Sequence, residues 1–366
     1  MKKAILLLSL CIFTLAGYAA KAQDGNALRI AVAGVSHDHI YQMIGILDRG
    51  DIEVVGVSEE NDRYREECPL HQRLAENCFF KDVREMLETV HPEAVVCYGP
   101  PCDHLAIVRE CALHGVDVMM EKPMTTSYKD ALKIRDLAQK YGINVLTNYC
   151  TTWYAAKRHA KEIADSGKIG RVFKMNFYGG HRGPAEIGCS EKFVSFLKDP
   201  KKGGAGAIVD FGCYGANLAT WMMGGVRPES VYAVMHTNKP QTYAPVDDDS
   251  TIVLKYANGV VVTIYGSWDW PYTRLDSYIY GSEGSIYQKD DSKMQVLVDE
   301  SLPTEFFDAP GLKKPLDDPY RFLKAVVRGE LKVSPTDLPS LENNMTTMEI
   351  LDAAIRSARL GKKITL

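Results

Sequence analysis

The chain has 366 residues, a length that favours two domains over one hydrophobic core. Its composition, 46% apolar and 25% charged without low-complexity tracts, is that of a globular soluble protein. The formal net charge of −4 and the lack of a basic patch argue against nucleic acid as a partner.

The N-terminal segment has the three parts of a cleaved secretory signal. Lys2 and Lys3 give a basic start, and an apolar stretch follows from Ala4 to Ala16. Ala20-Lys21-Ala22 then offers the small-x-small pattern that a signal peptidase accepts. We therefore expect residues 1–22 to be removed and the mature protein to be exported, in a bacterium to the periplasm.

Two kinds of membrane anchor are weaker interpretations of the same segment. The apolar stretch is shorter than the roughly 20 residues that a spanning helix needs, so we expect no stable membrane span. Cys11 is in the middle of this stretch and follows Leu10, which is large where a lipid-attachment site requires a small residue. We therefore expect no lipoprotein anchor. Loss of residues 1–22 removes three lysines and no acid and takes the net charge from −4 to −7.

The mature chain would keep eight cysteines, and none has metal-site or CxxC spacing. An exported protein can form disulfides, and Cys68 and Cys78, which flank one polar segment, are the best candidates for a pair. For the others we expect free, buried thiols.

From Leu28 to about Tyr149, short apolar strands alternate with amphipathic helices. The expected strands are Leu28 to Ala33, Glu53 to Val57, Cys78 to Lys81, Ala94 to Tyr98, Val116 to Met120 and Asn144 to Thr147. The expected helices are Ile40 to Asp48, Val83 to Val90, a helix after Pro101 through His114, and Tyr128 to Tyr141. This α/β alternation predicts a doubly wound parallel sheet, a dinucleotide-binding Rossmann domain over residues 23–149.

The second half changes to period-two alternation. The expected strands are Arg171 to Tyr178, Ser230 to His236, Ser250 to Tyr256, Val260 to Trp268, Ser277 to Tyr280 and Ser285 to Gln288, with helices at Ala155 to Ser166 and Tyr214 to Met223. They predict an α+β domain, residues 150–308, with a large, open, mostly antiparallel sheet. Residues 309–366, with helices at Pro319 to Gly329 and Leu341 to Leu360, are expected to pack back on both domains. Because an open sheet commonly needs a covering partner, we expect a homo-oligomer through this sheet.

The turn after the first strand is a candidate phosphate-binding turn. Such a turn needs small residues, so that backbone N–H groups can approach a diphosphate. Gly34 keeps the first glycine of G-x-G-x-x-G, but Ser36 and His39 stand at the other two positions. His37 and His39 could bind a metal, yet two ligands are too few and the sequence shows no third. We therefore predict no metal site, and expect the imidazoles to line a pocket mouth or cap the helix.

Glu59 follows the second strand, 25 residues beyond Gly34. A carboxylate at this place accepts hydrogen bonds from the adenosine ribose and repels a 2′-phosphate, which favours NAD over NADP. Glu60, the next residue, is the alternative.

Two further motifs could carry the chemistry. Glu121-Lys122-Pro123 ends a strand, which places a cation where an open parallel sheet gathers its ligands. Asp210-Phe211-Gly212-Cys213-Tyr214 follows a glycine-rich run and opens a helix. When an alcohol is oxidised, its hydroxyl proton must leave as hydride departs from carbon. The Tyr214 phenol can take that proton only if nearby positive charge, from Lys122 and a nicotinamide ring, lowers its pKa.

These residues resemble the Gfo/Idh/MocA oxidoreductases, the family of glucose-fructose oxidoreductase and inositol dehydrogenase. The resemblance spans nearly the whole mature chain and rests on the turn at Gly34, Glu59, Gly99-Pro100-Pro101 with His104, Glu121-Lys122-Pro123, Asn148-Tyr149, Ser166 to Gly170, Asp210 to Tyr214, Tyr280 to Gly284 and the last helix. It implies that the motif lysine, Lys122, contacts both nicotinamide ribose and substrate. It also implies cofactor-binding roles for Gly34, Ser36, His37, His39, Glu59, Pro101, His104, Glu121 and Asn148.

The chain departs from many members of that family at Tyr214, where they carry histidine. Tyrosine as the proton donor or acceptor is typical of the glucose-fructose oxidoreductase branch. The incomplete glycine turn is a second departure.

Substrate contacts are expected from aromatic and basic residues near the cleft. Trp268 and Trp270 are one residue apart on an expected strand, so both should point to one face, either to stack on a sugar ring or to fill an interface. His181 and Arg182, after two glycines, and Trp153, after Asn148-Tyr149, are further candidates.

The leading hypothesis is an NAD-dependent oxidoreductase acting on a secondary hydroxyl of a sugar or glycoside. Lys122 would position the alcohol, Tyr214 would exchange its proton, and Asp210 would orient the pair. Because free NAD is not expected to be recycled outside the cytoplasm, we expect a tightly bound cofactor. One alternative is redox-neutral glycoside cleavage, in which transient oxidation at sugar C3 permits elimination. The other is a non-catalytic sugar-binding protein on the same fold.

Overall fold

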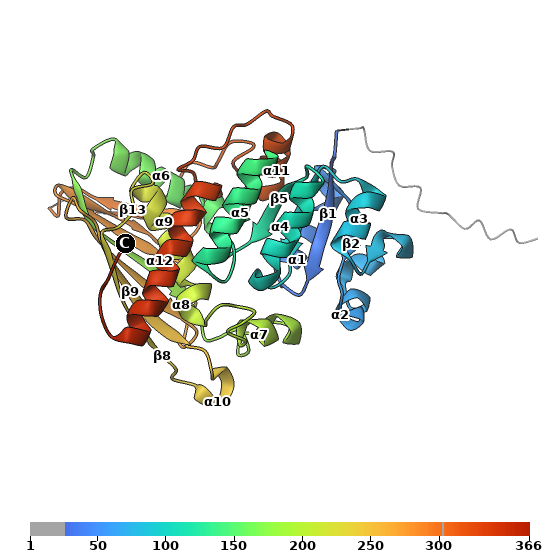
Figure 1. The fold of residues 1–366 in the computed structure, drawn as a ribbon. Coiled ribbons are helices and arrows are strands. Elements are labelled where there is room, and N and C mark those ends of the chain that lie inside the picture. The colour runs from blue at the N-terminus through green and yellow to red at the C-terminus, as the bar shows by residue number, and fades with distance from the viewer. Residues whose placement is uncertain (1–25, 302–303) are drawn as a thin grey trace, which may run out of the picture.

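Two β-sheets organise the chain, with helices packed between and around them (Figure 1). The computed structural model describes residues 26–301 and 304–366. The predicted signal segment, residues 1–22, lies outside this range, so its cleavage stays a prediction. The α/β fold class predicted from the sequence is confirmed, with one parallel sheet and one mostly antiparallel sheet.

The N-terminal sheet has six parallel strands in the order β3-β2-β1-β4-β5-β6. The strands are β1 (Leu28–Val35), β2 (Ile52–Ser58), β3 (Phe79–Phe80), β4 (Ala94–Tyr98), β5 (Asp117–Glu121) and β6 (Val145–Asn148). The helices between them are α1 (Ile40–Ile44), α2 (Asp62–Glu66), α3 (Val83–Val90), α4 (His104–Leu113) and α5 (Tyr128–Tyr141). The strand order reverses between β1 and β4, and in such sheets ligands bind at the carboxyl ends of the strands near this switch point.

Local capping explains which helices the sequence predicted well. Ser127 Oγ accepts a hydrogen bond from the Asp130 backbone N–H at 3.1 Å, and Gly142 ends α5 in the left-handed conformation. By contrast, α1 stops at Ile44 instead of Asp48, and His39 at its start makes no side-chain cap. The helix that follows the nucleotide turn is therefore only five residues long.

The second sheet has nine strands in the order β14-β13-β12-β11-β7-β10-β9-β8-β15. They are β7 (Val172–Gly180), β8 (Ser230–His236), β9 (Asp249–Lys255), β10 (Val261–Ser267), β11 (Ser277–Gly281), β12 (Gly284–Gln288), β13 (Lys293–Leu297), β14 (Phe307–Asp308) and β15 (Ile364–Thr365). Only the β7–β10 pair is parallel. The edge strands β13, β14 and β15 were not predicted.

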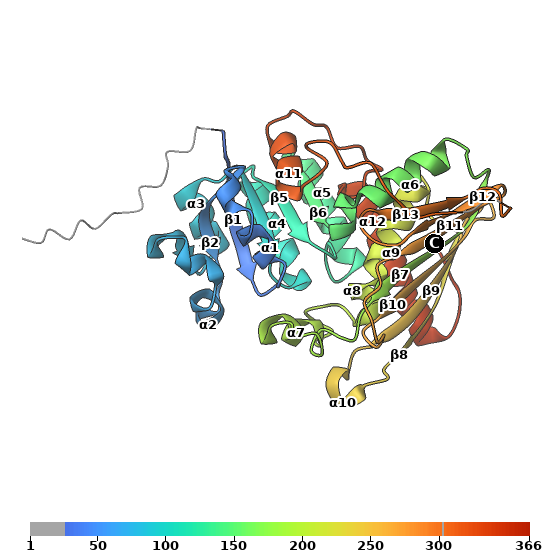
Figure 2. The ribbon, with the colours of Figure 1, turned by 180° about the vertical axis from the view of Figure 1, so that it is seen from behind.

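Helices cover one face of this second sheet, between it and the N-terminal domain (Figures 1 and 2). The helices of this half are α6 (Ala155–Asp165), α7 (Glu191–Leu197), α8 (Ala207–Asp210), α9 (Gly212–Met222) and α10 (Pro240–Tyr243). In the part of the chain that the structure describes, no helix covers the opposite face (Figure 2). That face carries tyrosines whose rings stack across neighbouring strands, as in the Tyr178–Tyr265 pair at 4.8 Å.

The C-terminal tail contacts both halves of the molecule. Helix α11 (Pro319–Val327) packs into the core of the N-terminal sheet, where the Tyr320 hydroxyl is hydrogen-bonded to that of Tyr98. Helix α12 (Leu341–Leu360) packs against α5, α9 and β8. The tail was expected to be helical, but its last residues form β15, which pairs with β8.

Eight cysteines fall in the described residues and all are free, including Cys68 and Cys78. The disulfide considered for these two is therefore not formed in this structure. None of the helices within residues 26–301 and 304–366 is long and apolar enough to cross a membrane.

The close approach of β1 to β4 at the nucleotide turn can be tested with two glycines. Gly34 and Gly50 both have positive φ, +74° and +77°, but a Cβ on Gly34 would lie 2.5 Å from Gly99 Cα, whereas one on Gly50 meets nothing within 4 Å. We expect Gly50→Ala to lose about 1–2 kcal/mol for its backbone conformation, and Gly34→Ala to lose about 1–3 kcal/mol more. Thermal unfolding of both variants measures this, and equal losses would contradict it.

Candidate active site

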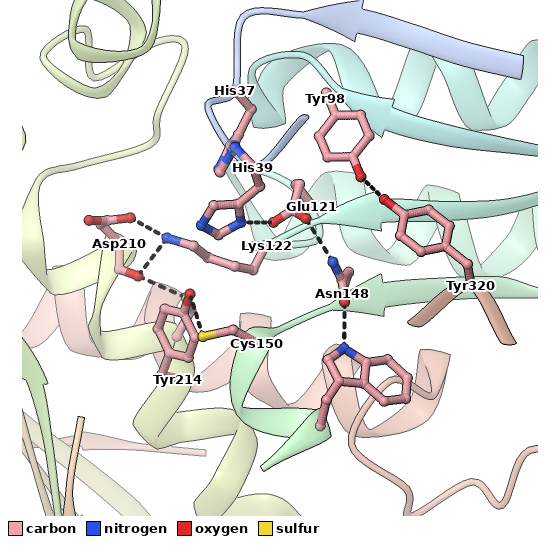
Figure 3. Close-up of polar contacts among 12 residues, drawn as sticks. His37, His39, Tyr98, Glu121, Lys122, Asn148, Cys150, Asp210, Tyr214 and Tyr320 are labelled. Carbon is pink, nitrogen blue, oxygen red and sulfur yellow. Dashed lines mark hydrogen bonds and ion pairs between the residues drawn. The ribbon is translucent and has the colours of Figure 1, made fainter. Parts of the chain in front are cut away.

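Lys122, Asp210 and Tyr214 come together between the two domains (Figure 3). Lys122 directly follows β5, Asp210 ends α8, and Tyr214 is in the first turn of α9. The Lys122 ammonium forms an ion pair with the Asp210 carboxylate and lies 3.2 Å from the Asp210 carbonyl oxygen. It also lies 5.0 Å from the centre of the Tyr214 ring. The three residues predicted to be catalytic therefore form one cluster.

Burial and charge act against each other in the Lys122–Asp210 pair. Each residue is only 6% exposed. Burial alone would lower the pKa of Lys122, but the Asp210 carboxylate outweighs it and raises that pKa above its ordinary value. Burial likewise raises the pKa of Asp210, and the Lys122 ammonium outweighs it, so that pKa falls below its ordinary value. The pair is therefore charged at neutral pH.

Asp210 is held in place by a short helix with an unusual cap. The Asp247 carboxylate accepts the backbone N–H groups of Gly206 at 2.9 Å and Ile208 at 2.7 Å, at the start of α8. A Cβ on Gly206 would lie 1.7 Å from the Asp247 carbonyl oxygen, so glycine is required there. Burial raises the pKa of Asp247 to about 6. A glycine in the run before Asp210 thus permits the close contact between Gly206 and Asp247.

Trp268 is the second partner of Asp210. Its indole N–H donates to Asp210 Oδ2 at 2.8 Å, and the side chain is fully buried against Tyr243. It therefore cannot stack on a sugar ring as a surface aromatic. The prediction that Trp268 and Trp270 share a face is wrong because β10 ends at Ser267; Trp270 lies instead near Tyr178.

The Tyr214 hydroxyl is protonated in this environment. Burial raises the pKa of the phenol well above its ordinary value. The charge of Lys122 alone does not reverse this effect, whereas the prediction combined it with the charge of a nicotinamide ring. The Cys150 thiol lies 3.7 Å from the hydroxyl oxygen, and Tyr149 packs edge-on against the ring at 5.3 Å. Cys150 was not predicted as a site residue, although it directly follows the Asn148-Tyr149 motif.

Glu121 is the centre of a second buried network (Figure 3). One carboxylate oxygen lies 2.8 Å from His39 Nδ1, and the other accepts the Asn148 side-chain N–H at 2.8 Å. The Asn148 side-chain oxygen, Oδ1, in turn accepts the Trp153 indole N–H at 2.9 Å. Burial alone would raise the pKa of Glu121, but His39 and Asn148 hold it below its ordinary value. Trp153 is thus tied to the site through Asn148.

His37, His39 and Glu121 offer ligand atoms that lie within 4.8 Å of one another. Glu121 is the third partner that the sequence did not reveal. Both imidazoles are engaged within the protein, because His37 Nδ1 accepts the His39 backbone N–H at 3.2 Å and His39 pairs with Glu121. Burial lowers the pKa of His37 well below its ordinary value, so this ring is neutral. The absence of a metal stays a prediction.

A groove of about 710 Å³ runs along the nucleotide turn and the end of β2. Its lining residues include Gly34, Ser36, Glu59, Gly99 and Pro100. The Glu59 carboxylate is oriented by the backbone N–H groups of Val35 at 3.1 Å and Asn61 at 3.0 Å. Its position in the groove matches the role of ribose ligand.

Pro101 and His104, predicted to contact the cofactor, are buried behind this groove. Pro100 lines it in place of Pro101. His104 is fully buried, and its Nδ1 lies 3.1 Å from the Met124 carbonyl oxygen. These two residues therefore support the loop that shapes the groove.

The two residues after β7 differ in position. His181 is partly buried, packs edge-on against Phe211 at 5.0 Å, and accepts the Gly183 backbone N–H on Nδ1. Burial lowers the pKa of His181, and the charges of Asp210 and Lys122 both influence it, which places it near the pair. Arg182 is exposed, and its carbonyl oxygen accepts a hydrogen bond from Lys239.

The parallel sheet, its nucleotide groove and the lysine at its carboxyl edge define the class of protein, an NAD-binding oxidoreductase. Two family models match the chain and together cover more than half of it. Residues 28–149 match the oxidoreductase family with an NAD-binding Rossmann fold, and residues 158–287 match the GFO/IDH/MocA C-terminal domain. The chain belongs to the Gfo/Idh/MocA family, as the sequence motifs predicted.

Similar proteins include two curated enzymes and a solved structure. D-xylose 1-dehydrogenase (NADP(+)) 2 of Haloferax volcanii is 25% identical over 72% of this chain and 77% of its own length. 2,7-anhydro-N-acetylneuraminate hydratase of Mediterraneibacter gnavus is 25% identical over 69% and 72%. The inositol dehydrogenase homolog of Azotobacter vinelandii, complexed with NAD+, has a TM-score of 0.80 at 17% identity and covers 93% of this chain and 98% of its own. At this identity, the last likeness shows a shared fold.

The Lys122–Asp210 pair can be tested through the pH dependence of stability. Lys122→Met leaves a buried carboxylate unpaired, which we expect to remove about 3–5 kcal/mol at neutral pH. The pKa of Asp210 would then rise above its unfolded value, so the loss should shrink as the pH falls and the carboxyl takes up a proton. The double variant Lys122→Met/Asp210→Asn, which buries no charge, should recover part of the loss. Thermal unfolding from pH 4 to 8 measures this, and a loss that does not vary with pH would argue against a charged pair.

Proposed function

We propose that the protein is an NAD-dependent oxidoreductase that acts on a secondary alcohol of a sugar or glycoside. The observation that carries this proposal is the Lys122 ammonium, paired with Asp210 and placed beside the Tyr214 phenol at the carboxyl edge of a dinucleotide-binding sheet. Glu59 in the nucleotide groove favours NAD over NADP because a 2′-phosphate would meet its negative charge.

Each residue of the cluster has a distinct part in this reaction. Lys122 donates a hydrogen bond to the substrate oxygen and stabilises the negative charge that develops there. Asp210 keeps Lys122 charged and oriented, and Trp268 fixes Asp210. Tyr214, protonated in its buried setting, gives a proton to a carbonyl oxygen in reduction. In oxidation it would first release this proton to solvent and then, as a phenolate, take the proton of the substrate hydroxyl. Bound NAD supplies the hydride acceptor.

The substrate class is supported by the similar enzymes. The Haloferax relative is named for D-xylose, and the Azotobacter structure is named as an inositol dehydrogenase homolog. Both names denote polyhydroxylated rings with secondary alcohols. Candidate contacts in this chain are His181 near the ion pair and Trp153 behind Asn148. Arg182, whose side chain is exposed, stays a candidate substrate contact.

Export of the mature protein is part of the proposal and is supported by the signal pattern in residues 1–22. In an exported enzyme the cofactor would have to stay bound through many turnovers. A second sugar or carbonyl compound would then reoxidise it in place.

Redox-neutral cleavage or hydration of a glycoside is the second candidate. It is favoured by one observation, the similarity to a hydratase of an anhydro sugar. Transient oxidation acidifies a neighbouring C–H bond, and elimination follows before the cofactor gives its hydride back. The same Lys122 and Tyr214 would serve both reactions.

Tyr214→Phe tests both candidates. Because it removes only the proton-exchanging hydroxyl, we expect kcat to fall about 100-fold or more while bound NAD, detected by native mass spectrometry, is unchanged. The matched control is Tyr256→Phe, because Tyr256 is also a buried tyrosine and its hydroxyl has no hydrogen-bond partner among the described residues. Turnover of sugars with a carbonyl acceptor is compared with release from a chromogenic glycoside.

Release of the chromophore with no net consumption of acceptor would select the redox-neutral reaction. Net oxidation of one sugar with reduction of another would select the oxidoreductase. Full activity of Tyr214→Phe on every substrate that the wild type uses would overturn the assigned role.

We further propose that two or more copies assemble through the helix-free face of the nine-stranded sheet. Tyr232 and Val234 on β8 are 43% and 51% exposed on that face, and only β9 separates them from Tyr265 of the stacked Tyr178–Tyr265 pair. Exposed apolar patches of this kind mark association sites.

Light scattering tests this assembly. We expect a dimer or larger species for the wild type and a shift towards monomer for Val234→Lys, because a lysine on each copy would bring like charges together in an apolar contact. Leu113→Lys, at an exposed position on α4, is the control and should keep the assembly. A wild type that is monomeric at micromolar concentration would rule the assembly out.

A further inference from the structure

A segment of the second domain reaches across to the nucleotide turn of the first. We call residues 183–206, which contain α7 and connect β7 to α8, the bridging segment. Helix α7 lies beside the N-terminal domain and below its sheet in Figure 1.

Two contacts fasten the bridging segment to the nucleotide turn. The Asp38 carboxylate accepts hydrogen bonds from the Ser190 backbone N–H at 2.8 Å and from the Ser190 hydroxyl at 2.5 Å. The His37 ring packs edge-on against Phe193 at 4.5 Å. Both contacts use residues of the turn itself, so the segment and the turn are held as one unit.

The far end of the bridging segment is fastened to the next loop of the parallel sheet. The Cys102 backbone N–H donates to the Lys202 carbonyl oxygen at 3.2 Å. Cys102 follows Gly99 and Pro100, and Gly99 is the residue that the Gly34 turn touches. Lys202 is exposed and is the residue of the bridging segment that lines the 710 Å³ nucleotide groove.

The diphosphate side of this groove needs a cation. The turn has only one of its three glycines, so side chains limit how closely a diphosphate can approach its backbone N–H groups. Helix α1 has only five residues and offers little helix dipole. Four basic residues line the groove. Lys81 pairs with Asp62 and Arg84 with Glu110, whereas Arg109 on α4 and Lys202 form no ion pair with another described residue. The Lys202 backbone is bonded to the loop of residues 99–102, which contacts the nucleotide turn at Gly34. Lysine binds phosphate as a point charge.

We propose that Lys202 binds the diphosphate of the dinucleotide cofactor, and that the bridging segment holds the cofactor between the two domains. This inference rests on the proposed use of NAD and adds a binding residue from the second domain. Release of the nucleotide then requires the Asp38–Ser190 contact to open, which suits an enzyme whose cofactor is retained.

The test compares Lys202→Ala with Lys201→Ala in the full mature protein. Lys201 is the adjacent exposed lysine and does not line the groove, so it controls for the loss of one charge. NADH affinity and dissociation rate are measured by fluorescence at low and high salt. We expect Lys202→Ala to weaken NADH about 10-fold or more and to reduce the salt dependence, and Lys201→Ala to change neither.

Ser190→Ala tests the fastening itself. It removes one of the two donors to Asp38 and leaves Lys202 in place, so NADH should dissociate faster while the lysine-dependent response to salt remains. Ser190 also caps α7, because its Oγ accepts the Phe193 backbone N–H at 3.3 Å. The Tm is therefore measured in parallel, since a cap defect alone would lower Tm without a faster NADH release.

The outcomes separate this inference from the proposed function. If the wild type binds no NADH under any condition, the proposed function fails and this inference fails with it. If the wild type binds NADH and Lys202→Ala behaves as Lys201→Ala does, the role of Lys202 is overturned and the proposed function stands.

Discussion

The buried ion pair between Lys122 and Asp210 is the interaction on which the site depends. It joins the carboxyl edge of the parallel sheet to the helices that cover the second sheet, so the pair also fixes how the two domains meet. Removing two charges from water is costly, and the mutual attraction offsets this only with additional hydrogen bonds. Trp268 and the Asp210 carbonyl oxygen provide them. A site of this kind keeps an ammonium charged where bulk water is excluded.

The same pair explains why Tyr214 has its proton in this structure. The carboxylate neutralises the ammonium charge, so little net positive charge remains to favour a phenolate, and burial dominates. Proton removal from Tyr214 therefore requires a further positive charge in the cleft. Oxidised nicotinamide has that charge and reduced nicotinamide does not, which would couple the acidity of the phenol to the redox state of the cofactor.

Much of the fold could be predicted because its signals are local. Alternating strands and helices, the Ser127 cap and the motif around Lys122 each lie within a few residues, and the alternation predicts a doubly wound parallel sheet. The pairing of Lys122 with Asp210 required the family resemblance, because the two are 88 residues apart. The role of Trp268 was missed because it depends on where β10 ends, and Glu121 was missed as a partner of His39 because only the parallel sheet brings β1 and β5 to one edge.

The incomplete glycine turn has a physical explanation in these long-range contacts. A third glycine serves close packing at the start of the helix, but here His39 fills that place and bonds to Glu121, the residue next to Lys122. Asp38 and His37 bind the bridging segment instead of leaving the turn open. The side chains of the turn thus prevent close backbone contact with a diphosphate, but they bind the turn to the ion-pair site and to the second domain. Because side chains keep a diphosphate away from the backbone N–H groups of the turn, a cation from the second domain, Lys202, would compensate for the weaker backbone contact.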